Sequence, residues 1–263
     1  MLSSWFGSNV ILAGLTVSLL AGLATALGAI PVFIFRRIPK WLHDGLLGFA
    51  AGVMLAATAF SLVIPALAAA GGGWKAAGIV GLSIFVGGGF VDLIDRWAPH
   101  EHFIKGPEGA TGAARSRLAR IWLFIIAITI HNFPEGLAVG VAAGSGDMNA
   151  GLSVGMGIGL QNIPEGLAVA VALVGENYSM LQVFVITLLT GLVEPIGGAF
   201  GVLGVVLAKG VLPWALAFAA GAMLFVISDE IIPETHERGN ERFATFMLLI
   251  GFIVMMALDN VLG

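Results

Sequence analysis

Long runs of apolar residues, separated by short polar or Gly/Pro breaks, fill almost the whole chain. A transmembrane helix needs about twenty mostly apolar residues, because each residue adds about 1.5 Å and the hydrocarbon core is about 30 Å thick. By this rule the pattern predicts a single transmembrane domain over residues 1–263 with eight spans. The predicted spans cover residues 8–35, 43–70, 75–97, 119–143, 150–175, 179–208, 211–233 and 242–262.

The basic residues are divided unevenly between the two sides of this predicted bundle. Only Lys75 and Lys209 lie on the side of the turns that follow spans 2, 4 and 6. The other ten follow or flank spans 1, 3, 5 and 7: Arg36, Arg37, Lys40, Arg96, Lys105, Arg115, Arg117, Arg120, Arg238 and Arg242. Since cytoplasmic turns carry the excess of Lys and Arg, both termini are expected outside and the polar loop 98–118 in the cytoplasm.

The composition agrees with a membrane protein and argues against several other classes. Hydrophobic residues make up 58% of the 263 residues, charged residues 11%, and the mean hydropathy is +1.00. The first apolar run is too long for a signal-peptide core, which indicates a retained span. The net charge of −4 gives no reason to expect nucleic acid. The chain has no cysteine, which excludes disulfides and thiolate metal ligands.

Two near-identical polar motifs interrupt the fourth and fifth apolar runs. They read HNFPEGLAVGVA from residue 131 and QNIPEGLAVAVA from residue 161. Each places a nitrogen or oxygen ligand four residues before a carboxylate, and residues i and i+4 share one face of a helix. His131 is therefore predicted to lie beside Glu135, and Gln161 beside Glu165. Ionisable groups inside a membrane span usually serve a function.

Each motif also contains a proline inside its predicted helix. Pro134 and Pro164 have no N–H, so they are expected to free the carbonyl four residues earlier and to kink both helices. The helical rise places His131, Gln161 and Glu194 about 15 to 20 Å into their spans, near the midplane. Glutamates at 135, 165 and 194 would repel one another in low dielectric unless protonated or neutralised by a cation. The sequence therefore predicts a divalent-metal site formed by two copies of one motif.

These motifs give the chain a resemblance to a known family. Consecutive helices reading HNxPEG and xNxPEG resemble spans 4 and 5 of the ZIP (Zrt/Irt-like) divalent-metal transporters of prokaryotic type. The similarity extends to GFAAGVMLAATAFS in span 2, GLVEP in span 6 and SDEIIPETH in span 7. The resemblance implies an all-α polytopic membrane protein, an eight-helix bundle with both termini outside. It also implies inverted symmetry between the first three and last three spans, and a homodimer.

The resemblance further implies a binuclear metal centre. The transport site would consist of His131, Glu135, Gln161 and Glu165. The second site would consist of Asn132, Asn162 and Glu194, with Glu135 and Glu165 bridging the two ions. Family members often have His where this chain has Gln161 and Asp where it has Asn162. The neutral Asn162 therefore predicts a second divalent site that is weak, empty, or filled by a protonated acid or a monovalent ion.

Other polar residues are candidates for the path on either side of this centre. Acids near the predicted cytoplasmic ends of spans 2, 3 and 7, together with an H-x-H in the loop, could form an exit. These candidates are Asp44, Asp95, Asp229, Glu230, His100 and His102. The resemblance alone adds Met54 as a candidate for the entrance. The competing interpretations are interfacial charges, polar loop residues and, for Met54, ordinary packing.

Two other functional classes stay open from the sequence. A membrane metalloenzyme could use the same ligands, although HExxH and the Glu-x-x-His pair of di-iron bundles are absent. A channel would use a continuous polar pore instead of alternately exposing one site.

The favoured function is uptake of a divalent transition metal into the cytoplasm by an alternating-access carrier. The block with spans 4 and 5 would slide against the rest, as in an elevator mechanism. The oxygen and nitrogen ligands suit Zn²⁺, which is the favoured ion, and also Fe²⁺, Mn²⁺ and Cd²⁺. The metal is expected as substrate, with no enzymatic activity and no cofactor. The expected location is the cytoplasmic membrane of a bacterium.

Overall fold

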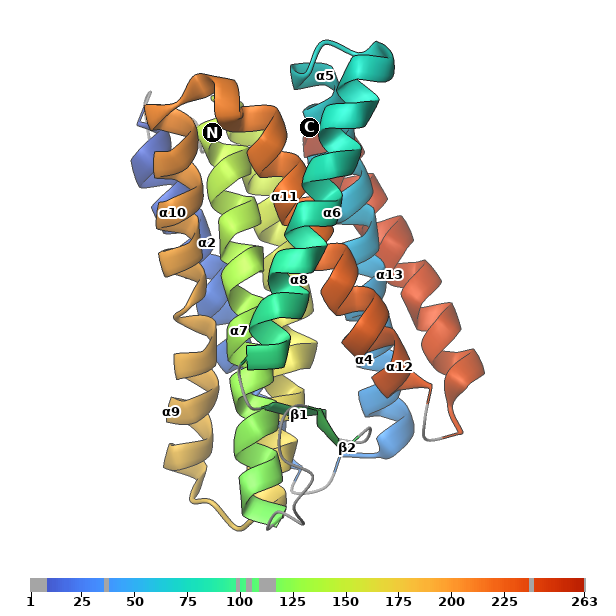
Figure 1. Cartoon of the computed structure of the whole chain (residues 1–263). Helices are drawn as coiled ribbons and strands as arrows, with labels where there is room; N and C mark the ends of the chain where they lie inside the picture. The colour runs from blue at the N-terminus through green and yellow to red at the C-terminus, as the bar shows by residue number, and fades with distance from the viewer. Residues whose placement is uncertain are drawn as a thin grey trace.

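The computed structural model describes residues 9–35, 38–97, 100–102, 106–108, 117–236 and 239–262. Nearly all of these residues are helical (Figure 1), which confirms the predicted all-α polytopic class. Seven helical stretches in the described residues are long and apolar enough to cross a membrane. They are Val10–Ile34, Lys40–Ala69, Gly73–Leu93, Met148–Gly175, Met180–Leu207, Leu212–Thr235 and Glu241–Val261. Helix α7 (Arg117–Gly144), of 28 residues, occupies the position of the predicted fourth span.

Some of these stretches are single helices and others are broken. Uninterrupted helices are α6 (Gly73–Trp97), α7, α8 (Met148–Gly175) and α13 (Glu241–Leu262). Paired segments are α2 (Val10–Leu27) with α3 (Ile30–Ile34), and α9 (Met180–Gly191) with α10 (Glu194–Leu207). The helices begin and end within three residues of the predicted spans.

The remaining two stretches each contain a π-helical segment. Helix α4 (Lys40–Ala56) continues through η1 (Ala57–Val63) into α5 (Ile64–Ala69), and α11 (Leu212–Val226) through η3 (Ile227–Ile231) into α12 (Ile232–Thr235). The connections include a 3₁₀ turn, η2 (Lys209–Val211), and an antiparallel pair of short strands, β1 (His100–His102) and β2 (Gly106–Glu108).

The helices pack as two blocks. We call α2, α7, α8, α9 and α10 the motif block, because it carries both PEG motifs, and α4, α6, α11 and α13 the frame block. Inside each block, glycines bring helix backbones into direct contact, as is common in membrane bundles. A side chain at Gly136 would strike the carbonyl of Glu194, and one at Gly166 that of Thr25. In the frame block, Gly52 is packed in the same way against the carbonyl of Leu248.

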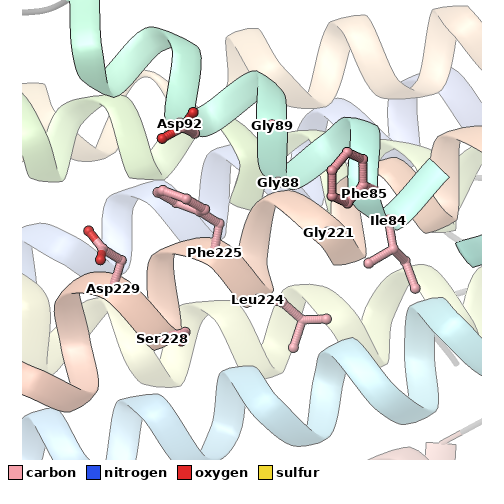
Figure 2. A pocket seen from close by; sticks show the side chains of 10 residues that line it. All are labelled: Ile84, Phe85, Gly88, Gly89, Asp92, Gly221, Leu224, Phe225, Ser228 and Asp229. Atoms are coloured by element: carbon pink, nitrogen blue, oxygen red, sulfur yellow. The ribbon is translucent and has the colours of Figure 1, made fainter. Parts of the chain in front are cut away.

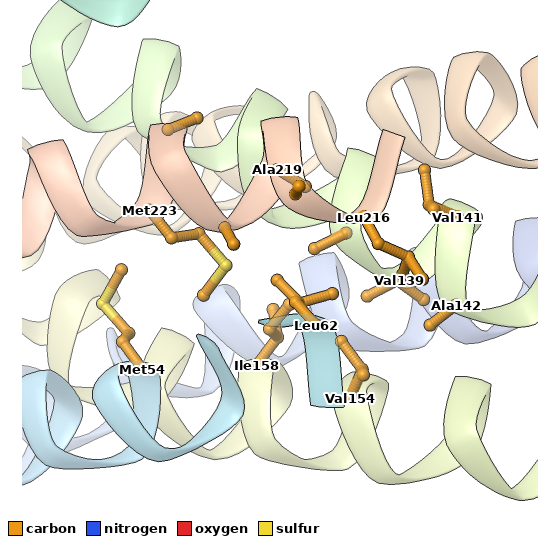
Figure 3. Packing of buried hydrophobic residues seen from close by; sticks show 14 of the residues in the cluster. Met54, Leu62, Val139, Val141, Ala142, Val154, Ile158, Leu216, Ala219 and Met223 are labelled. Atoms are coloured by element: carbon orange, nitrogen blue, oxygen red, sulfur yellow. The ribbon is translucent and has the colours of Figure 1, made fainter. Parts of the chain in front are cut away.

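The contact between the two blocks has a different character. Figure 3 shows side chains from α4, η1 and α11 facing side chains from α7 and α8. Fully buried apolar residues such as Met54, Met223 and Ile158 fill this interface. Gly157 of α8 lies against the Met255 side chain of α13, so here too a side chain makes the contact.

The frame block contains a short internal repeat. FAAGVML at 49–55 in α4 recurs as FAAGAML at 218–224 in α11, and each copy is followed by a π-helical segment that ends at Ile-Pro. Proline cannot donate to the carbonyl four residues earlier, and a wide turn accommodates that loss. Gly52 contacts α13, whereas its counterpart Gly221 contacts Ile84 of α6. Since α4 and α11 run in opposite directions (Figure 1), this repeat agrees with the inverted symmetry implied by the family resemblance.

Candidate metal centre

Three prolines shape the helices that carry the candidate ligands. Helices α7 and α8 continue through Pro134 and Pro164, so the predicted kinks stay a prediction. In the third helix the effect is larger, because α9 ends at Gly191 and α10 begins only at Glu194. Pro195 has no N–H to donate to the Gly191 carbonyl four residues earlier, which explains this break.

All seven residues predicted to bind metal are buried. The most exposed is His131, at 4%, and Asn132, Gln161, Asn162 and Glu194 are fully buried. The other two, Glu135 and Glu165, are at most 3% exposed. Polar and ionisable side chains at such depth in a membrane protein are costly unless they are paired or functional.

Each of the three amide nitrogens of the centre donates a hydrogen bond within the motif block. Gln161 Nε2 donates to Glu135 Oε1 at 2.5 Å, which joins the two motifs to each other. Asn162 Nδ2 donates to Glu194 Oε1 at 2.6 Å and to the Ala21 carbonyl at 2.8 Å. Asn132 Nδ2 donates to the Thr190 carbonyl at 2.8 Å. These bonds fix the orientation of the three amide groups.

One oxygen atom on each of six candidate ligands has no such partner. On the described candidate ligands, six buried oxygens lack a hydrogen-bond partner: Asn132 Oδ1, Glu135 Oε2, Gln161 Oε1, Asn162 Oδ1, Glu165 Oε1 and Glu194 Oε2. Each buried unsatisfied group costs about 1–3 kcal/mol. Carboxylate and carbonyl oxygens are ligands for cations. The centre is therefore rich in electron-pair donors and poor in hydrogen-bond donors, which suits a cation.

The candidate ligands do not form one complete metal-coordination shell in this structure. His131 Nε2 lies 2.6 Å from Glu230 Oε1 of the frame block. Among the described residues, no group of three or more His, Asp and Glu side chains is close enough to hold a metal ion. The pairing of His131 with a residue outside the two motifs was not predicted from the sequence.

The exit candidates lie in several different environments. Glu230 faces His131, but its neighbour Asp229 lines a groove of about 650 Å³ between α6 and α11, shared with Asp92 (Figure 2). Asp44 is fully buried and accepts a hydrogen bond from Asn240 Nδ2 at 2.8 Å. The predictions for Asp95, His100 and His102 concern side chains that lie outside the described ones. Met54, the entrance candidate, is fully buried in the interface between the blocks.

The structure also shows polar residues that the sequence analysis missed. Thr25 and Thr187 are buried beside the motif helices, and their hydroxyl oxygens have no partner among the described residues. Asp259 of α13 accepts hydrogen bonds from Ser61 Oγ at 2.6 Å and from Ser153 Oγ at 3.4 Å, linking the frame block to α8. An isolated acid in the last apolar run was the available signal for Asp259, whereas threonines in apolar helices give none.

The fold and the buried centre together define an integral membrane protein with a polar, oxygen-rich site enclosed by its helices. Residues 98–259 match the family described as ZIP zinc transporter. The chain is 47% identical to the zinc transporter GufA of Myxococcus xanthus, over 95% of this chain and 99% of the relative. It is 44% identical to the zinc transporter ZIPB of Bordetella bronchiseptica, over 91% of this chain and 78% of the relative. It is 37% identical to the human zinc transporter ZIP11, over 91% of this chain and 94% of the relative. The chain therefore belongs to the ZIP zinc transporter family.

Family membership decides several of the predictions made from the sequence. It confirms the predicted family resemblance and the prediction of an integral membrane protein. The bacterial members of the family support a location in the cytoplasmic membrane. Members of this family are transporters, so the metalloenzyme alternative is set aside.

Proposed function

We propose that this chain carries Zn²⁺ across the membrane and binds it between α7 and α8. The observation that carries the proposal is the group of six buried oxygens without hydrogen-bond partners, contributed by the two PEG motifs and Glu194. The names of the similar proteins, all described as zinc transporters, support the choice of metal.

The ligands would come from both motifs. Glu135 Oε2 and Glu165 Oε1 are the carboxylate oxygens of the two motifs that lack a hydrogen-bond partner, and two carboxylates neutralise one divalent ion. Gln161 would add its carbonyl oxygen, and His131 would add its ring nitrogen after leaving Glu230. Zinc accepts histidine nitrogen and carboxylate oxygen in four-coordinate sites. Fe²⁺, Mn²⁺ and Cd²⁺ accept the same ligand types, so the proposal covers them as competing substrates.

An elevator movement of the motif block against the frame block accounts best for the packing. Backbone contacts through glycine hold the helices of the motif block together and, in the frame block, join α4 to α13 and α6 to α11, whereas side chains fill the interface between the blocks. Apolar side chains can slide past one another without breaking backbone contacts. On the predicted outer side of the centre, Leu62, Val154 and Ile158 are buried among other apolar residues. A channel would need a polar path there, so this packing favours a carrier.

The proposed direction is from outside to cytoplasm. It rests on the ten basic residues that flank one set of turns against two on the other. We also propose that the protein forms a homodimer, as the family resemblance implies.

Zinc uptake into proteoliposomes that contain the purified protein and a zinc-sensitive dye tests this function. Uptake should saturate with zinc concentration, and Glu135→Ala or Glu165→Ala should abolish it while the protein stays folded. Glu241→Ala is the matched control, because it removes an exposed glutamate at the start of α13. Flux that rises linearly over a wide concentration range would favour a channel instead. Near-wild-type uptake by either motif variant would remove this site from the mechanism.

A further inference from the structure

The break in the sixth span brings a helix C-terminus into the buried centre. Helix α9 ends at Gly191, two residues before α10 begins at Glu194. The carbonyl of Thr190, in the last turn of α9, accepts the hydrogen bond from Asn132. The C-terminal end of a helix carries partial negative charge. Broken transmembrane helices commonly use such ends and their unpaired carbonyls to hold small cations in transporters.

Four residues at this break, or in contact with it, carry buried oxygens without partners. They are Thr25 Oγ1, Asn132 Oδ1, Asn162 Oδ1 and Glu194 Oε2, and each belongs to a side chain at most 1% exposed. Thr25 Oγ1 lies so close to Gly191 that a side chain there would collide with it. Asn162 donates both to Glu194 and to the Ala21 carbonyl, one helical turn before Thr25. Continuous contacts therefore connect all four residues around the end of α9.

The donor set here differs from that of the zinc site. It has one carboxylate, and its other oxygens are neutral amide and hydroxyl groups. A single negative charge with several neutral oxygens suits a hard cation of charge +1. A second divalent ion would leave one charge uncompensated in low dielectric, which is costly.

We propose that these oxygens, at the C-terminal end of α9, bind an alkali cation, with Na⁺ as the first probe, next to the transported metal. The proposal deepens the proposed zinc transport and rests on it for the following charge count. Glu135 and Glu165 neutralise one divalent ion, and Glu194 neutralises one alkali ion. The three carboxylates are thereby matched by three positive charges. The bound alkali ion holds Asn162 and Glu194 in place and leaves the other two glutamates to the metal.

Thermal unfolding of the purified protein in detergent tests this site without measuring transport. NaCl should raise the midpoint relative to choline chloride at equal ionic strength, because a ligand that binds only the folded state stabilises it. A KCl series identifies which alkali ion binds more tightly. Thr25→Val should weaken the apparent Na⁺ affinity about tenfold, the equivalent of about 1.4 kcal/mol.

Two variants make the test specific. Thr58→Val is the matched control, because Thr58 is equally buried but its hydroxyl already donates to the Met54 carbonyl. It should keep the full Na⁺ effect. His131→Ala should lose zinc-induced stabilisation and keep the Na⁺ effect. Equal midpoints in NaCl, KCl and choline chloride would overturn this inference whatever zinc does. Stabilisation by Na⁺ without any by zinc would instead contradict the proposed zinc transport and leave the alkali site standing.

Discussion

His131 Nε2 of the motif block lies 2.6 Å from Glu230 Oε1 of the frame block. One partner is a proposed zinc ligand, and the other lies in the π-helical segment η3, just before Ile232-Pro233. Both side chains are buried, so water screens this contact little. The histidine cannot hold zinc and keep this contact through the same ring nitrogen. With His131 as a zinc ligand, as proposed, Glu230 would compete with the metal for this histidine and would join the two blocks once the metal has left.

The first prediction concerns this competition. Glu230→Gln removes the charge but keeps the size of the side chain, so His131 should be more available to zinc. Hydrogen bonds to charged groups contribute about 1.5–3 kcal/mol, which predicts zinc binding at least about tenfold tighter. Release should slow correspondingly, and the maximal rate of uptake should fall. Zinc titration of purified protein and uptake in proteoliposomes measure the two effects.

Asp229→Asn is the control for Glu230→Gln. Asp229 is the neighbouring acid in η3, but it lines the groove between α6 and α11. Its substitution should leave zinc affinity near the wild-type value. Equal changes in both variants would mean that the general negative charge of η3, and not contact with His131, controls the metal.

The second prediction concerns the glycine contacts that hold the motif block together. A side chain at Gly201 of α10 would collide with the backbone of α7, at the Leu137 carbonyl, whereas Gly204, one turn later, has open space around it. Gly201→Ala should destabilise the protein by about 1–3 kcal/mol, as overpacking does. Gly204→Ala should be neutral or stabilising by up to about 1 kcal/mol, because alanine favours a helix over glycine. Thermal unfolding in detergent compares them, and equal losses would argue against the close contact of α7 with α10.

The sequence predicted the helices and the buried polar centre but not how the centre is connected. Apolar runs and the repeated motif were local signals, so the positions of Glu135 and Glu165 on α7 and α8 followed from spacing alone. The pairing of His131 with Glu230 depends on how two blocks pack, and residues 99 positions apart give no local signal for it. Thr25 looked like an ordinary apolar-helix residue, and only the break at Gly191 makes its hydroxyl informative.

The third prediction tests the orientation of the chain. Asn149→Cys, at the exposed start of α8, should react with a membrane-impermeant thiol reagent in intact cells. Gly106→Cys and Glu241→Cys should react only after the cells are opened. Gly146 and Gly239 are poorer positions, because their φ angles of +92° and +82° would strain a cysteine. The chain has no cysteine of its own, so the background is clean. The reversed labelling pattern would overturn the proposed import direction.

The fourth prediction uses Asn162 to change the charge of the second site. In the wild type, this residue contributes an amide that donates to Glu194 and an oxygen without a partner. Asn162→Asp replaces the donor by a carboxylate, so the site gains one negative charge and Glu194 loses its hydrogen bond. Two divalent ions would then meet four carboxylates, and a second zinc ion should bind tightly. The same variant should lose its preference for Na⁺.

Counting the bound ions decides this prediction. Calorimetric titration of the purified protein should give one tight zinc ion per protomer in the wild type and two in Asn162→Asp. Asn162→Leu is the matched control, because it removes the amide without adding charge and should still bind one zinc ion. Two equally tight zinc ions in the unmutated protein would show that Glu135, Glu165 and Glu194 hold four positive charges without help. The charge count that assigns the second site to a monovalent ion would then be wrong.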